Sequence, residues 1–284
     1  MTLPTFLGIG VPRAGTTWLH QLLQTHPDIY VPTRRKELSF FDLYYGRGLG
    51  WYAKFFPDEP ERTRYRCFGE VTPYYFYCEE CPARIAGAGI EKLILMLRHP
   101  VDRAWSYYGQ KIRNGMFRGS FEEFLSQSRW PVIEQGHYTR YLDRYFARFD
   151  RSQMLILLLE EAAADVPATR RALATFLGVD GSRFADSAVR EAVNQSYVPR
   201  APQLYGLAFR LSRLCRRLDL DWVVNAAKRI GVREAFGATG KLTPMAPETR
   251  QRLDDLFQPE ITALEASLGM SMDVWRRATG ARSS

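Results

Sequence analysis

The chain of 284 residues lacks any run of eighteen or more apolar residues, which excludes a membrane-spanning helix. It also lacks the signs of a secretory leader, because its first ten residues, MTLPTFLGIG, hold no basic segment and no small-residue cleavage site. Internal repeats, low-complexity tracts and an obvious linker are absent as well. We therefore expect a cytoplasmic protein in which residues 1–284 form a single domain.

Cysteine is scarce, with four residues in the whole chain: Cys67, Cys78, Cys81 and Cys215. Cys78 and Cys81 form a C-x-x-C pair, but no second pair follows at the spacing of a zinc site. We interpret all four as ordinary thiols in a reducing compartment, and we expect no metal.

Positive charge is present in excess. Lys and Arg total 39 against 31 Asp and Glu, so the formal net charge is +8. This balance suits an anionic ligand, nucleic acid or an anionic membrane surface. The basic residues are scattered rather than gathered with aromatic residues into patches, so we expect no nucleic acid partner.

Short apolar runs alternate with helical patterns along the chain. The runs at 5–11, 92–98 and 153–159 read as buried strands, and helices are expected at 16–25, 101–114 and 165–177. This alternation predicts an α/β fold with a parallel sheet covered on both faces. Further helices are expected throughout 121–149, at 203–218 and at 247–268, the last two as helical additions after residue 180.

The stretch GIGVPRAGTT, residues 8–17, partly matches a phosphate-binding loop. Gly10, Gly15 and Thr17 have the required spacing, but Thr16 occupies the lysine position and Arg13 is the only cation in the stretch. A strand, a glycine turn and a helix start would place backbone N–H groups at one point, which favours an anion site. The alternative is a tight turn with a solvent-facing arginine.

An ATP or GTP site would need the loop lysine and a magnesium-binding carboxylate. The strand at 92–98 ends in Arg98, whereas Glu160 and Glu161 follow the strand at 153–159 and leave a magnesium-dependent phosphotransferase open. A sulfuryl group carries less charge than a phosphoryl group, so side-chain cations and loop N–H groups would suffice for it without magnesium.

A second candidate site lies in LILMLRHPVDRAWSYY, residues 93–108. Arg98 ends a buried strand, and Ser106 follows on the next helix, so the two side chains could hold one phosphate together. The alternative is an ion pair between Arg98 and a local carboxylate such as Asp102.

The two stretches together resemble the signatures of the sulfotransferases that use 3′-phosphoadenosine 5′-phosphosulfate (PAPS) as co-substrate and release adenosine 3′,5′-bisphosphate (PAP). The resemblance covers most of residues 5–275. It implies the sulfotransferase fold, a P-loop-like parallel sheet flanked by helices, with a helical lid or acceptor region at about 200–240. It also implies that the 5′-phosphosulfate is bound by Arg13, Ala14, Gly15, Thr16, Thr17 and Trp18. Arg98 and Ser106 would bind the 3′-phosphate.

Other segments resemble the carbohydrate (heparan sulfate-type) branch of that family. RRKELSFFD, residues 34–42, is similar to the segment in which a glutamate before an aromatic pair is the catalytic base, which implies Glu37 as the base and Lys36 near the sulfate oxygens. The segment from Lys241 onward resembles bacterial members. Two departures stand out: Val71 replaces a lysine of the heparan enzymes, and the late Gly-Arg of the nucleotide site is matched only by Gly240 and Lys241.

The residues that would act on the acceptor are less defined. A carboxylate such as Glu37 can take the proton of the acceptor hydroxyl, and Arg13 can stabilise the departing phosphate oxygen during in-line transfer. A histidine base is the alternative, with His20, His26, His99 and His137 as the candidates. Glu70, Phe41 and Tyr74 are predicted to contact the acceptor, and Glu70 could instead hold Arg13 or Lys36, or belong to a structural ion pair.

The segment 203–230 leaves three alternatives open. Its leucine stripe and arginine face would suit a lid over the acceptor, a peripheral contact with an anionic bilayer, or a pair of core-packed helices. The acceptor is expected to be a hydroxyl of a sugar, a lipid-linked compound or a natural product. A non-catalytic nucleotide-binding module is a further alternative, and the oligomeric state is open.

Overall fold

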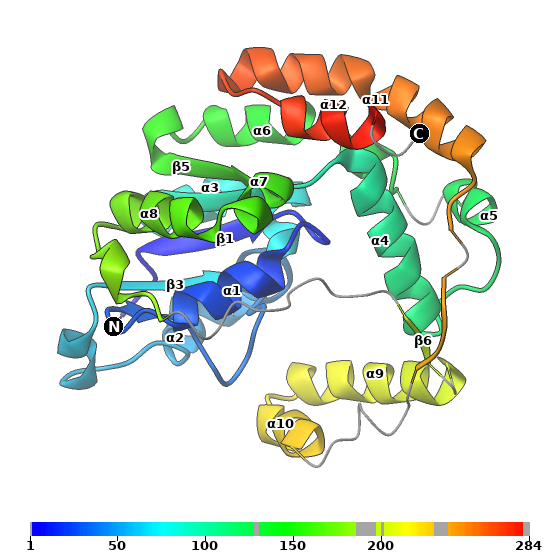
Figure 1. The fold of residues 1–284 in the computed structure, drawn as a ribbon. Helices are drawn as coiled ribbons and strands as arrows, with labels where there is room; N and C mark the ends of the chain where they lie inside the picture. The colour runs from blue at the N-terminus through cyan, green and yellow to red at the C-terminus, as the bar shows by residue number, and fades with distance from the viewer. Residues whose placement is uncertain are drawn as a thin grey trace. The chain divides into compact units, whose positions relative to one another are not determined.

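The computed structural model describes residues 2–127, 131–185, 197–199, 202–229, 238–242 and 244–280 (Figure 1). Its contacts divide the chain into two compact units. The sheet unit comprises Met1–His99, His137–Val193 and Pro259–Ser284, and the helical unit comprises Pro100–Gly136 and Asn194–Gln258. We describe each by itself, and the single-domain prediction stays a prediction.

The sheet unit is built on five parallel strands in the order β2-β3-β1-β4-β5. Their bounds are β1 Phe6–Gly10, β2 Ile29–Tyr30, β3 Cys67–Val71, β4 Lys92–Leu97 and β5 Met154–Leu158. β1 and β3 are buried along their whole length, as expected for strands covered on both faces. The predicted parallel α/β sheet is thereby confirmed.

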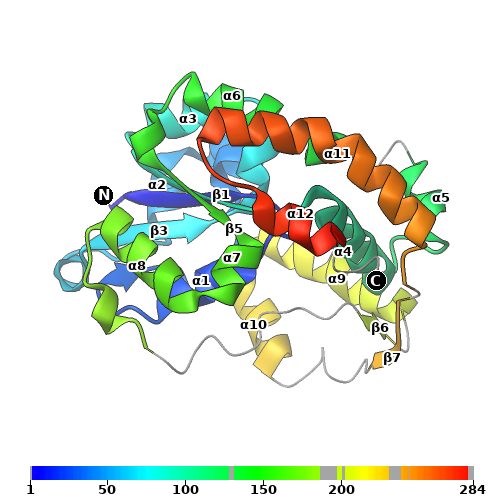
Figure 2. The same ribbon diagram turned by 45° about the horizontal axis from the view of Figure 1, so that its top comes forward.

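Helices cover both faces of this sheet. Figures 1 and 2 show α1 (Thr16–Gln24), α7 (Leu159–Ala164) and α8 (Val166–Leu177) on one face, and α3 (Cys81–Gly87) and α6 (Thr139–Phe146) on the other. The remaining elements of the unit are α2 Gly48–Ala53, α12 Asp273–Gly280 and the short helices η1 Phe40–Tyr44, η2 Tyr45–Arg47, η3 Glu61–Arg64, η4 Pro73–Tyr77, η6 Arg151–Gln153 and η7 Gly181–Arg183.

The helical unit has a separate hydrophobic core formed by α4 (Pro100–Arg113), α5 (Phe121–Leu125) and the first part of α11 (Pro247–Leu268). Val101, Phe124 and Phe257 are among its fully buried residues. The unit also contains η5 Glu134–Gly136, α9 Pro202–Arg217, α10 Asp221–Arg229 and an antiparallel pair of β6 Tyr197–Pro199 with β7 Ala238–Lys241. The predicted helical additions in the C-terminal third are present.

The continuous helix predicted over 121–149 is wrong, and residues 128–130 of it lie outside the described residues. α5 ends at Leu125 and α6 begins only at Thr139. Pro131 falls between them and has no N–H group to donate within a helix. α6 has its own start, because Glu260 accepts the Thr139 N–H at 2.8 Å.

The search for membrane spans covers only the described residues, and within them no helix combines the length and the apolar character needed to cross a bilayer.

Candidate active site

The loop that joins β1 to α1 is held by backbone bonds. The Val11 N–H donates to the Met96 carbonyl on β4 at 2.7 Å, and the Ala14 N–H donates back to the Val11 carbonyl at 3.2 Å. Arg13 has a positive φ of 75°, a conformation that costs a non-glycine residue free energy. The loop therefore follows a tightly constrained path from the strand into the helix.

Gly15 is required for two reasons. Its φ is +80°, and a Cβ atom added there would lie 2.5 Å from Cδ1 of Leu159. As the N-cap of α1 it has no side chain with which to cap, so the N–H groups of the first turn stay available to a ligand. The first turn carries no acidic residue, and its partial positive charge favours an anion.

Arg98 reaches this loop from the end of β4. Its Nη1 donates to the Arg13 carbonyl oxygen at 3.1 Å, and its own carbonyl accepts the Tyr138 hydroxyl at 2.8 Å. Asp102, the alternative partner for Arg98, instead pairs with Arg250 at 2.6 Å within the helical unit. Two predicted phosphate ligands from segments 85 residues apart are thus adjacent.

Ser106 belongs to α4 in the helical unit and is buried. Gly240 and Lys241 belong to β7 of the same unit. Their predicted approach to the nucleotide stays a prediction.

Lys36 supplies the ammonium group that the loop lacks at position 16. Its Nζ donates to the Thr17 hydroxyl at 2.9 Å and pairs with Oε1 of Glu37, also at 2.9 Å. The side chains of Lys36 and Glu37 keep 24% and 39% of their surface exposed, so both can meet a ligand. Loop, cation and candidate base are therefore connected by direct contacts.

The segment that carries Glu37 has an unusual backbone. Glu37 and Ser39 have φ values of 61° and 53°, in the left-handed region that few non-glycine residues adopt. The segment is held by η4 and the residue that caps it: the Ser39 N–H donates to the Thr72 hydroxyl at 3.2 Å, and the Phe40 N–H donates to the Tyr75 hydroxyl at 2.8 Å.

Glu70 lies beneath this segment, almost wholly buried on β3. Oε1 accepts the hydroxyls of Tyr75 at 2.6 Å and Tyr52 at 3.2 Å, and Oε2 accepts the Thr72 hydroxyl at 2.7 Å. The backbone N–H of Leu38 also donates to the carboxylate. Burial raises the pKa of Glu70 to about 7, and the hydrogen bonds from Tyr75, Thr72 and Leu38 oppose that rise. Its partners are hydroxyls and a backbone amide, not Arg13 or Lys36.

His20 lies elsewhere than the sequence pattern suggests. The helical pattern of α1 places it off the apolar stripe, yet it is buried, and among the described residues its Nδ1 has no hydrogen-bond partner. Burial, and to a lesser extent the charge of Lys36, lower its pKa to about 4, and Glu37 opposes the change. His20 is therefore neutral at pH 7, and the helical pattern of α1 gives no sign of its place near Lys36 and Glu37.

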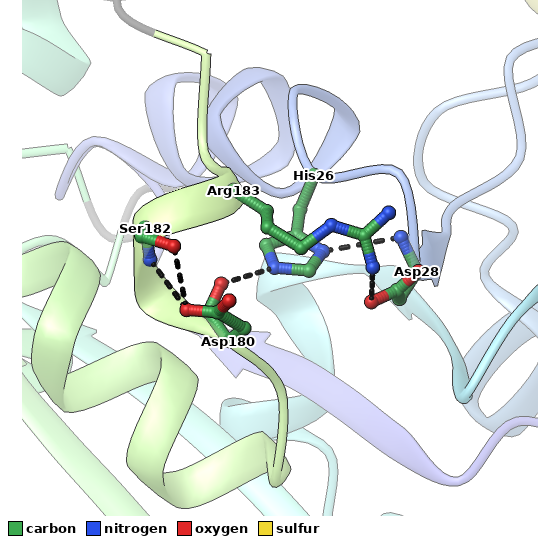
Figure 3. A network of polar contacts seen from close by, with 5 residues as sticks. All are labelled: His26, Asp28, Asp180, Ser182 and Arg183. Atoms are coloured by element: carbon green, nitrogen blue, oxygen red, sulfur yellow. Dashed lines mark hydrogen bonds and ion pairs between the residues drawn. The ribbon is translucent and has the colours of Figure 1, made fainter.

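His26 is held on the turn after α1 by backbone groups on both ring nitrogens (Figure 3). Its Nδ1 accepts the Asp28 N–H at 3.1 Å, so its Nε2 carries the proton and donates to the Asp180 carbonyl at 2.8 Å. Arg183 pairs with the Asp28 carboxylate, and Asp180 accepts the Ser182 hydroxyl at 2.8 Å. This network fits the turn predicted at His26 and occupies both nitrogens.

The two remaining histidines, His99 and His137, each lie close to a glutamate. The His99 N–H donates to Oε1 of Glu160 at 3.0 Å, and Oε2 of Glu160 accepts the Trp275 indole N–H at 2.9 Å. Glu160 was one of the two carboxylates that left a magnesium-dependent phosphotransferase possible, and each of its oxygens accepts a hydrogen bond within the fold. His137 lies 3.4 Å from Oε2 of Glu260, a partner that spacing along the sequence could not show.

The predicted acceptor contacts differ in accessibility. Tyr74 exposes 39% of its surface, whereas Phe41 is fully enclosed by aromatic neighbours that include Tyr45, Tyr52 and Tyr75. Phe41 supports the segment from within, so in this structure its ring is not presented to an acceptor.

Metal ligands are not grouped in the part of the chain that the structure describes, where no three His, Cys, Asp or Glu residues lie together in a way that could hold an ion. The four cysteines are free thiols.

Known proteins resemble this chain in sequence and in fold. A family model described as “Sulfotransferase domain” matches residues 3–200. The crystal structure of a sulfotransferase from Alicyclobacillus acidocaldarius superposes with a TM-score of 0.64 and 24% identity, covering 97% of this chain and all of that one. At this identity the likeness shows a shared fold.

Curated relatives match in sequence. The chain is 34% identical over 186 residues to heparan sulfate glucosamine 3-O-sulfotransferase 3A1 of Mus musculus, covering 62% of this chain and 46% of the relative. It is 38% identical over 135 residues to the membrane-associated sulfotransferase kil1 of Dictyostelium discoideum, covering 47% of this chain and 26% of that protein. The chain spans about half the length of the first of these relatives, or less.

Proposed function

The chain belongs to the sulfotransferase domain family, and on this basis we propose that it transfers a sulfuryl group from PAPS to a hydroxyl group of an acceptor. The observation that carries the proposal is the position of Lys36, whose ammonium group contacts both the Thr17 hydroxyl of the loop and the Glu37 carboxylate.

The residues at the loop fit the anionic end of such a donor. The donors for sulfate and phosphate oxygens are the uncapped start of α1, the Lys36 ammonium group and the guanidinium groups of Arg13 and Arg98. Arg98 lies next to Arg13, because it donates to the Arg13 carbonyl. The donor supplies an activated sulfuryl group. Arg13, Lys36, Thr16 and Thr17 bind and orient its oxygens.

Glu37 is the proposed base. Its carboxylate accepts the proton of the acceptor hydroxyl while the oxygen of that hydroxyl forms its bond to sulfur and the bond from sulfur to the 5′-phosphate breaks. The products are a sulfate ester and PAP. Lys36 stays next to the base and stabilises the charge that develops on the departing oxygen.

At the other end of the donor, Arg98 and Ser106 are the proposed ligands of the 3′-phosphate, and Gly240 and Lys241 are proposed to close over the nucleotide. The relative from Mus musculus acts on heparan sulfate according to its name, which favours a sugar hydroxyl as the acceptor. Tyr74 is the proposed acceptor contact. A lipid-linked or natural-product acceptor, a cytoplasmic location and a bacterial origin stay predictions.

Transfer of labelled sulfate tests the reaction. We expect Glu37→Gln to abolish most turnover while PAP still binds, and Arg13→Ala to weaken both. Full turnover in Glu37→Gln would exclude Glu37 as the base.

Calorimetry with PAP, its 2′,5′ isomer, ADP and ATP identifies the nucleotide. A preference for ATP with magnesium would favour a phosphotransferase. Binding without any turnover would favour a non-catalytic module.

We further propose that α9 rests on an anionic lipid surface. Three leucines on one side of this helix, Leu207, Leu211 and Leu214, and Leu218 directly after it are each more than half exposed, and Trp222 at the start of α10 is 67% exposed. A different side of α9 packs closely, because a Cβ atom on Gly206 would lie 2.8 Å from the carbonyl oxygen of Asn114, the residue after α4. Arg210 and Arg217 flank the leucines and would meet lipid phosphates.

Co-sedimentation of the full chain with vesicles tests this surface. We expect binding to vesicles that contain phosphatidylserine, and loss of binding in the pair Leu211→Glu and Leu214→Glu. Leu256→Glu is the matched control, because Leu256 is an exposed leucine on a different helix. Equal binding by all variants, or no binding by the wild type, would contradict the proposal.

A further inference from the structure

We propose that Glu70 is a positioning residue that sets the backbone path of the segment next to the base, an inference that rests on the proposed role of Glu37. Through its own carboxylate and two hydroxyl groups, Glu70 satisfies the four consecutive backbone N–H groups from Leu38 to Phe41.

These four bonds converge on one buried carboxylate. The Leu38 N–H donates to Glu70 directly. The Ser39 N–H donates to the Thr72 hydroxyl, which in turn donates to Oε2 of Glu70. The N–H groups of Phe40 and Phe41 lie 2.8 and 3.4 Å from the Tyr75 hydroxyl, which donates to Oε1.

The direction of each bond depends on the carboxylate. A hydroxyl oxygen that accepts a backbone N–H must send its own hydrogen elsewhere, and Glu70 accepts that hydrogen from both Thr72 and Tyr75. Hydroxyls that donate to a carboxylate are in turn better acceptors. Loss of Glu70 would therefore weaken all four anchors together.

The segment needs such anchors because its backbone is strained. The left-handed conformations of Glu37 and Ser39 persist only where the surroundings over-determine them. With the anchors in place, the Glu37 side chain is held against Lys36, and Lys36 against Thr17.

The same anchors also fix the position of the base relative to the loop. The Thr72 N–H donates to the Gly8 carbonyl of β1 at 2.9 Å, and Glu70 pairs with Leu7 in the register of β3 and β1. β1 leads directly into the loop at Val11. The base and the sulfate-binding loop therefore share one rigid strand as their frame.

Two tyrosines offer a matched pair of variants. Tyr52 and Tyr75 are both fully buried and both donate to Oε1 of Glu70, at 3.2 and 2.6 Å. Only Tyr75 also accepts a backbone N–H from the segment. Phenylalanine at either position keeps the ring and removes the hydroxyl, so the two variants differ chiefly in whether the segment loses its anchor.

The experiment measures hydrogen exchange, kcat, KM and PAP affinity in the full chain. We expect Tyr75→Phe to speed amide exchange of Phe40 and to lower kcat by roughly 10- to 100-fold, with PAP affinity unchanged. Tyr52→Phe should change each by less than roughly threefold. Glu70→Gln should resemble Tyr75→Phe, and Tyr75→Phe decides the question if Glu70→Gln does not fold.

Equal effects of Tyr52→Phe and Tyr75→Phe, or a parallel loss of PAP affinity and kcat, would show general structural damage and overturn the inference. The exchange measurement needs no turnover. If the wild type transfers no sulfate, the proposed function fails, while faster exchange at Phe40 in Tyr75→Phe alone still supports the anchoring by Glu70, and unchanged exchange still overturns it.

Discussion

A single ammonium group connects the parts of the candidate site at the residue scale. Lys36 Nζ contacts a hydroxyl of the loop and the carboxylate of the proposed base, each at 2.9 Å. The sequence places Lys36 nineteen positions after Thr17, outside the loop that a phosphate-binding motif describes. The phosphate-binding motif does not include Lys36, so its contact with the loop is visible only in the structure.

Lys36→Met tests the proposed role of this ammonium group. We expect kcat for sulfate transfer to fall by roughly 10²- to 10³-fold, because the site loses a cation aimed at developing negative charge. Arg34→Met is the matched control, since Arg34 is an exposed cation two positions away, and its change should stay within roughly threefold. Equal losses in the two variants would indicate that only the net charge of the segment matters.

The raised pKa of Glu70 predicts how stability depends on pH. Its pKa is about 7 in the folded chain against an ordinary value of 4.5, so between these values the folded state holds a proton that the unfolded state has released. Rising pH therefore removes stability across this window. We expect the free energy of unfolding of the wild type, relative to Glu70→Gln, to fall by roughly 2–3 kcal/mol from pH 4.5 to pH 7. Urea unfolding at several pH values measures it, and a constant difference would contradict it.

At the scale of elements, the strands β1, β4 and β5 were predicted from the sequence, whereas the contacts between elements were not. The apolar runs at 5–11, 92–98 and 153–159 contain β1, β4 and β5 with at most two residues to spare, because buried parallel strands need continuous apolar sequence. The range 121–149 failed, because aromatic periodicity continues through a segment that Pro131 interrupts.

The residues of the candidate site also divide into those that the sequence indicated and those that it did not. The loop, Arg98 and the pair of Lys36 and Glu37 follow from motifs that are local in sequence. The Glu70 network joins positions 38–41, 52, 70, 72 and 75, and no spacing rule relates a carboxylate on one strand to backbone amides some thirty residues earlier. Burial of His20 likewise depends on what packs over α1, which its helical pattern does not contain.

Gly15→Ala tests the junction of β1 and α1. We expect a loss of about 2–4 kcal/mol in the free energy of unfolding, because alanine adds both a strained positive φ and a Cβ atom 2.5 Å from Leu159. Gly178→Ala is a matched control, since Gly178 has a φ of +77° but nothing within 4 Å of an added Cβ, and it should lose only about 1 kcal/mol. Urea unfolding gives both values, and equal losses would refute the close approach of Leu159.

At the scale of the whole molecule, the residues that the structure describes form two hydrophobic cores, one in each unit. The second sequence motif is divided between them, because Arg98 directly follows β4 in the sheet unit and Ser106 lies on the first helix of the helical unit. If both side chains bind the 3′-phosphate of one nucleotide, their contributions to nucleotide affinity are coupled.

A double-mutant cycle on PAP affinity measures this coupling. We expect Arg98→Ala and Ser106→Ala each to weaken PAP binding, and the double variant to lose less than the two losses added together, by roughly 0.5–3 kcal/mol, because the second substitution removes a ligand from a phosphate already poorly held. Adenosine 5′-phosphate is the control: Ser106→Ala should not change its affinity, whereas Arg98→Ala should lower it, since Arg98 also supports the Arg13 carbonyl. Strictly additive losses with PAP would mean that the two residues do not bind the same phosphate.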